Sequence, residues 1–118
     1  MAAVSSDTRP VYLRLRDAIA AAILDGRYRA GDPLPSVRAF AVDQGANPLT
    51  VAKAYQSFQD EGLIVVRRGV GMFVAPGAAE RLLASERQSF LDEQWPRIAD
   101  TIRRLDLDLA DLLHHDPA

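Results

Sequence analysis

The sequence predicts a mainly α-helical fold with one small β-hairpin, and three observations support this prediction. Two helix-start signals lie close together, at Ser36 and at Asn47-Pro48. A helix-stop glycine, Gly62, is followed by two short apolar runs that Arg68-Gly69-Val70-Gly71 joins. The residues after this hairpin carry an apolar repeat in alternating steps of four and three, which is typical of helices packed side by side. Two short helices followed by a hairpin form a winged helix-turn-helix, so we expect this fold followed by C-terminal dimerisation helices.

The first helix is expected to begin near Pro10, because proline is favoured in the first turn of a helix. Apolar residues recur every four positions along it, which predicts a buried face made of Val11, Leu15, Ile19 and Ile23. Three neighbouring residues widen this face: Tyr12, Ala22 and Leu24. Gly26 is expected to end the helix, and Gly31-Asp32-Pro33 to form a turn in the connector that follows.

The next two helices and the hairpin are defined by their end signals. Ser36 is expected to cap the second helix and Gly45 to close it, with Asn47 as the cap of the third helix and Pro48 at its first position. The third helix is expected to run to Glu61. The second and third helices turn two sets of apolar residues inward: Val37, Phe40 and Ala41, and Val51, Tyr55 and Phe58. The strands are predicted at 63–67 and 72–75.

The C-terminal helices carry a long apolar stripe on residues 76–118. Pro96 is expected to kink the helix or to restart it at Trp95, and residues 106–108 to break it again before a short last helix. We divide the chain into residues 1–76, the winged helix-turn-helix domain, and residues 77–118, the helical segment expected to dimerise. A second copy of the chain is the simplest cover for the stripe, although folding back onto the first helix is the alternative. The expected dimer interface is Leu91, Trp95, Ile98, Ile102, Leu105, Leu109 and Leu112.

Composition excludes several classes of protein. The chain has no cysteine, and no apolar run approaches the length of a membrane span. The first residues lack the pattern of a secretory signal, so we expect a cytoplasmic protein. The histidines, His114 and His115, lie together near the end of the chain, and no nucleophile motif is present, so we expect no catalysis. We also expect no cofactor and no metal site, because acidic and histidine residues near a chain end are usually solvated.

The net charge of −2 conceals an uneven distribution. Residues 1–75 carry nine basic and seven acidic residues, whereas residues 76–118 carry five and nine. The acidity therefore lies in the C-terminal segment, and a local basic face on the first part of the chain remains compatible with binding to double-stranded DNA.

The third helix has the outward face that the major groove requires, because small polar side chains gather near its start. Residues of the second helix and the hairpin tip extend this surface. The expected DNA-binding residues are Arg38, Asn47, Pro48, Thr50, Lys53, Gln56, Arg67, Arg68 and Gly69. A winged helix that binds protein is the alternative, and loss of binding at high salt would favour DNA.

Several sequence blocks resemble the N-terminal domain of the GntR family of bacterial transcription regulators. These blocks are Pro10-Val11-Tyr12, Ile23-Leu24-Asp25-Gly26, Gly31-Asp32-Pro33-Leu34-Pro35-Ser36-Val37-Arg38, Asn47-Pro48-Leu49-Thr50-Val51-Ala52-Lys53-Ala54-Tyr55, Glu61-Gly62-Leu63-Ile64 and Gly69-Val70-Gly71-Met72-Phe73-Val74. The form of the third helix and the short segment after the wing resemble the YtrA subfamily. Leu49, Val70 and Met72 depart from the usual family pattern.

The resemblance implies DNA contacts from Arg38, Asn47, Pro48, Thr50 and Lys53, and from the wing around Arg68 and Gly69. It also implies a short helical dimerisation segment in place of a large effector domain. We therefore expect a homodimeric transcription regulator, a repressor rather than an activator, that binds a palindromic operator. The operator, the regulated genes and any small-molecule effector are not predicted by the sequence.

Overall fold

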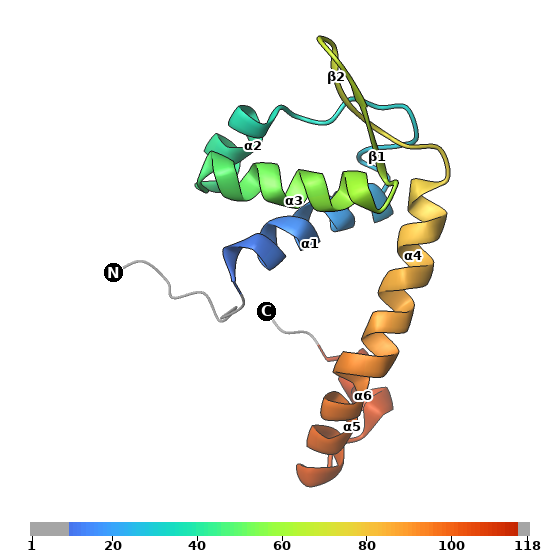
Figure 1. Ribbon diagram of the computed structural model, residues 1–118. Coiled ribbons are helices and arrows are strands. Elements are labelled where there is room, and N and C mark those ends of the chain that lie inside the picture. The colour runs from blue at the N-terminus through green and yellow to red at the C-terminus, as the bar shows by residue number, and fades with distance from the viewer. Residues whose placement is uncertain (1–9, 116–118) are drawn as a thin grey trace. The chain divides into compact units, whose positions relative to one another are not determined.

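The computed structural model describes residues 10–115, which form two compact units. The first unit ends at Leu82 and the second begins at Leu83. The first contains α1 (Val11–Leu24), α2 (Val37–Gln44), α3 (Pro48–Asp60), β1 (Ile64–Arg67), β2 (Gly71–Val74) and the start of α4 (Ala78–Ser89). α3 lies across α1, with α2 beside its first turns and the hairpin of β1 and β2 after its last turn (Figure 1). The predicted winged helix-turn-helix is confirmed.

The ends of α2 and α3 follow the predicted signals. The Ser36 hydroxyl accepts a hydrogen bond from the Ala39 N–H at 3.1 Å. Gly45 ends α2 with a φ of 62°, a left-handed conformation that glycine adopts without steric cost. The Asn47 side-chain oxygen accepts the Leu49 N–H at 2.8 Å and caps α3. Two helices thus start within a short stretch because each has its own local cap.

The core of the first unit lies between α1, α2 and α3. It is built from the predicted inward faces, with Val51, Ala54 and Phe58 completely buried on α3. The predicted α1 face is wrong at Val11 and Leu24, which are both exposed. They are the first and last residues of α1, and the buried positions of this helix lie between them.

The wing is an antiparallel hairpin in which Ile64 pairs with Val74 and Arg67 with Gly71. β1 begins one residue later than predicted and ends where predicted, whereas β2 is displaced by one residue toward the turn. The connector before α2 pairs with the other edge of β2, which was not predicted. The Leu34 N–H donates to the Met72 carbonyl at 2.8 Å, and the Val74 N–H donates to the Asp32 carbonyl at 3.0 Å. These bonds fix the wing to the segment that leads into α2.

The second unit is helical. After α4 it contains a π-helical turn (Phe90–Gln94), α5 (Trp95–Arg104) and α6 (Leu109–Leu113). The restart at Trp95 is confirmed, whereas the π-helical turn was not predicted. Pro96 has no N–H to donate to a carbonyl in the preceding turn, which explains why the regular ladder is interrupted here.

The predicted break at residues 106–108 is also confirmed. Asp106 has a φ of 54°, and the Asp108 side chain accepts the Ala110 N–H at 2.8 Å to begin α6. The apolar stripe therefore continues across two separate helices rather than along one. Within residues 10–115, no helix is long and apolar enough to cross a membrane.

Candidate nucleic-acid interface

The side of α3 opposite the core carries most of the candidate residues. Asn47, Pro48, Lys53 and Gln56 are exposed, and Thr50 is half-buried. Asn47, Pro48 and Thr50 lie at the cap and first turn of α3, where backbone N–H groups and the helix dipole favour an anion, and Lys53 and Gln56 follow on the next two turns. The structure therefore brings the five candidates together along one side of α3, from its cap to its third turn.

Lys53 is held by an aromatic ring from another helix. Its ammonium nitrogen lies 5.5 Å from the centroid of the Tyr12 ring on α1, a cation–π contact. Such a contact limits the rotamers of a long side chain while leaving its charge exposed. The apolar pattern of α1 predicts Tyr12 on its buried face and gives no link to Lys53, because the two residues are far apart in the sequence.

Two α3 side chains have part of their hydrogen-bonding capacity already used. The Asn47 oxygen caps the helix, so its amide N–H₂ is the group that can face a ligand. The Gln56 amide donates to the Asp60 carboxylate at 2.9 Å. This bond orients Gln56 and leaves its carbonyl oxygen as an acceptor.

The wing presents two arginines in different settings. The Arg67 guanidinium lies 4.9 Å from the centroid of the Phe73 ring, and its cross-strand partner Gly71 has no side chain in the way. Arg68 is exposed in the turn that Gly69, with a φ of 77°, makes possible. Among residues 10–115, no hydrogen bond or ion pair is found for Arg68, so its charge is available at the tip.

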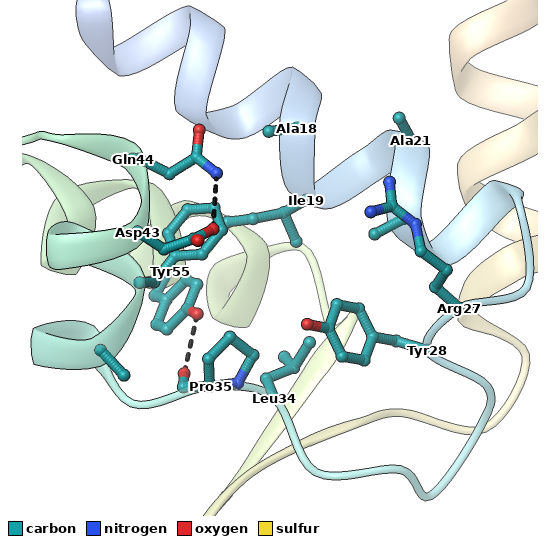
Figure 2. A pocket seen from close by; sticks show the side chains of 13 residues that line it. Ala18, Ile19, Ala21, Arg27, Tyr28, Leu34, Pro35, Asp43, Gln44 and Tyr55 are labelled. Atoms are coloured by element: carbon teal, nitrogen blue, oxygen red, sulfur yellow. Dashed lines mark hydrogen bonds between the residues drawn. The ribbon is translucent and has the colours of Figure 1, made fainter.

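The position of α2, which carries the exposed Arg38, is fixed through Tyr55. The Tyr55 hydroxyl donates to the Pro35 carbonyl at 2.8 Å, just before the α2 cap (Figure 2). Its ring also stacks on Phe40 with the centroids 5.9 Å apart. Burial, with a smaller contribution from Tyr28, raises the pKa of the Tyr55 phenol, so the group stays a donor at neutral pH.

A cavity of about 490 Å³ lies beside this hydrogen bond, between α1, α2 and the connector. Figure 2 shows Tyr28, Leu34 and Pro35 on one side of it and Ile19 on the other. None of the nine candidate DNA-binding residues lines this cavity. It is therefore separate from the candidate interface.

The second unit leaves most of the predicted stripe uncovered. Trp95 and Ile102 are half-buried, and the Trp95 ring lies 6.4 Å from that of Phe90. The other members of the stripe are exposed: Leu91, Ile98, Leu105, Leu109 and Leu112. In the part of the chain that is described, no three acidic, histidine or cysteine side chains are grouped to hold a metal ion.

Comparison with known proteins identifies the family. Residues 11–74 match the model of the bacterial regulatory proteins of the gntR family. The chain belongs to the GntR family. The matched segment covers α1, α2, α3 and the wing, and the members of this family are DNA-binding transcription regulators.

Individual relatives agree with this assignment. The GntR-family chain is 35% identical over 85 residues to the HTH-type transcriptional repressor YtrA of Bacillus subtilis, covering 72% of this chain and 65% of YtrA. It is 35% identical over 71 residues to YhcF, an uncharacterized HTH-type transcriptional regulator of the same species, covering 60% and 59% of the two chains. The chain thus spans less than two thirds of either relative.

A solved structure extends the similarity beyond the first unit. A transcriptional regulator from Oenococcus oeni has a TM-score of 0.68 and 34% identity, covering 87% of this chain and 85% of that one. The winged-helix fold and the resemblance to YtrA expected from the sequence are both confirmed.

Proposed function

We propose that this protein represses transcription by binding a palindromic operator as a homodimer. The observation that carries the proposal is the row of polar side chains along one side of α3, from its cap to its third turn, together with a wing after the last turn whose tip arginine is unpaired among the described residues. A helix with this face can enter the major groove, while wing arginines reach phosphates or a neighbouring minor groove.

The roles of the candidate residues differ. Thr50, Lys53, Gln56 and the Asn47 amide face the base edges in this proposal, with Pro48 beside them. Arg38, Arg67 and Arg68 contribute positive charge toward the phosphates, and Gly69 allows the wing backbone to approach closely. The phosphate contacts supply affinity and the α3 contacts supply sequence preference.

The dimer is proposed from the uncovered stripe of the second unit. Full burial of a Leu, Ile or Trp side chain is favourable by about 1.5–3 kcal/mol, so seven uncovered or half-covered positions represent a strong drive to associate. A two-fold dimer would present two copies of α3 to two half-sites, which explains why a palindrome is expected.

We assign residues 1–76 to DNA binding and residues 77–118 to dimerisation, although Ala78 and Leu82 of α4 also pack in the core of the first unit. The relative YtrA is named a repressor, and a dimer bound over a promoter blocks polymerase sterically. We place the protein in the cytoplasm, where bacterial operators are found, and propose no cofactor.

Selection from a library of random duplexes tests this function directly. The full chain should enrich one sequence made of two inverted half-sites, and it should bind that duplex far more tightly than a scrambled one. Arg38→Ala and Lys53→Ala should fold normally but bind with at least tenfold lower affinity, about 1.4 kcal/mol. Failure to enrich any sequence, or wild-type affinity in both variants, would contradict the proposal.

A further inference from the structure

We propose that Leu49 recognises the 5-methyl group of a thymine in each half-site. This inference depends on the proposed function, because it assigns one specificity-determining contact to the same surface of α3. The group that Leu49 would contact is a single methyl group on a pyrimidine base in the major groove.

The placement of Leu49 is unusual for an apolar residue. Its side chain is 79% exposed, and among the exposed residues of α3 it is the only large hydrophobic one. It lies between Pro48 and Thr50 and precedes Lys53 by one helical turn, so it stands within the candidate interface. Its backbone N–H is already bonded to the Asn47 oxygen, which fixes the first turn that carries the side chain.

The chemistry of Leu49 leaves few possible partners in the major groove. Its side chain neither donates nor accepts a hydrogen bond, so it cannot satisfy the polar edges of guanine, adenine or cytosine. The thymine 5-methyl is the apolar group that the bases expose in this groove. Contact with it removes both groups from water, whereas a cytosine at the same position offers no methyl and would leave Leu49 over a polar edge.

Leu49 should therefore act differently from its polar neighbours. Asn47, Thr50 and Lys53 select bases or phosphates through hydrogen bonds, while Leu49 selects thymine over cytosine through shape and apolar contact. Loss of one methyl contact is expected to weaken binding by about 2- to 5-fold per half-site.

The test uses the operator obtained by selection, with deoxyuridine replacing each thymine in turn in both half-sites. Deoxyuridine keeps every hydrogen-bonding group of thymine and lacks only the methyl. Dissociation constants are measured by fluorescence anisotropy for the wild-type chain, for Leu49→Ala and for Val42→Ala. Val42 is a matched control, because it is also 79% exposed but lies on α2.

The expected result is one symmetry-related thymine position at which uracil weakens the wild-type chain, while Leu49→Ala binds both duplexes equally. Val42→Ala should keep the wild-type response to uracil at that position. The inference is overturned if Leu49→Ala retains the sensitivity of the wild-type chain at every thymine, or if no thymine is sensitive. Both results would leave the proposed function intact, because that function fails only if no specific operator is bound.

Discussion

The two ends of the Asn47 amide group are assigned two purposes. Its oxygen caps α3, while its N–H₂ remains available for the proposed contact with DNA. Lys53 and Arg67 are oriented in a similar way. The ring of Tyr12 holds Lys53 and the ring of Phe73 holds Arg67, while both charged groups remain exposed to solvent. The fold thus orients individual side chains of the candidate interface in advance, which would lower the entropy cost of the proposed DNA binding.

The two purposes of Asn47 can be separated by substitution. Asn47→Ala should lower the free energy of unfolding by about 1 kcal/mol, since the cap is lost, and should also weaken operator binding. Asn47→Asp keeps a capping oxygen but removes the amide donor, so it should retain stability and still lose affinity. Urea denaturation and anisotropy measure the two effects. Wild-type affinity in Asn47→Asp would show that the amide donor does not contact DNA.

A second prediction for a single residue concerns the hydrogen bond of the Tyr55 hydroxyl. Tyr55→Phe should lower the free energy of unfolding by about 1 kcal/mol, because the bond to the Pro35 carbonyl is lost.

The size of this loss should depend on pH only in the alkaline range. The folded-state pKa is raised above the unfolded value of about 10, so the stabilisation is fully present below pH 10 and is lost only as pH rises above it. Urea denaturation of both proteins between pH 6 and 9 should therefore give a constant difference. A difference that declines within this range would contradict the assigned donor role.

At the scale of elements, the wing is held by the pairing of its two strands and by hydrogen bonds to the connector before α2. β2 pairs with β1 on one edge and with the segment before α2 on the other. The connector therefore links the direction of the wing to the start of α2. Arg68 lies at the tip of the wing, away from these hydrogen bonds.

Arg68 should contribute one phosphate contact per subunit. Arg68→Ala is expected to reduce the slope of log affinity against log salt by about 0.9 for each half-site. The control is Arg104→Ala, which removes an exposed arginine from the second unit. Both slopes are measured by anisotropy titrations over a salt range of about 50 to 300 mM. An unchanged slope for Arg68→Ala would exclude the wing tip from the interface.

The elements also explain what could be predicted from the sequence. Caps, glycine stops and the hairpin turn were predicted because each depends on a few adjacent residues, such as Ser36 or Gly45. The connector pairing with β2, the ring of Tyr12 under Lys53 and the π-helical turn before Pro96 were missed. The first two join residues distant in the sequence, and the third is a small change in hydrogen bonding that has no distinctive residue pattern.

At the scale of the whole molecule, the proposed function requires that two copies of the chain associate through the second unit. Ile98 and Leu105 remain exposed, the latter by 61%, although they belong to the apolar stripe. Burying them against a second copy would offset the loss of freedom on association and would place two DNA-binding units on one operator.

Introducing a charge into the stripe should therefore separate the subunits. Ile98→Asp is expected to shift the protein from dimer to monomer, because association would bury an unpaired carboxylate. Arg104→Asp adds a carboxylate to the same helix outside the stripe and should leave the dimer intact. Sedimentation velocity gives the mass of each protein in solution. A dimeric Ile98→Asp protein would show that the stripe is not the interface.

A salt titration of anisotropy on three duplexes decides whether the protein is a dimeric, sequence-specific regulator: the selected palindrome, a single half-site and a scrambled sequence. The palindrome should bind most tightly, with two subunits per duplex, and its salt slope should be about twice that of the half-site. Equal affinity for all three duplexes, or salt-independent binding, would contradict a dimeric, sequence-specific regulator that acts through α3 and the wing.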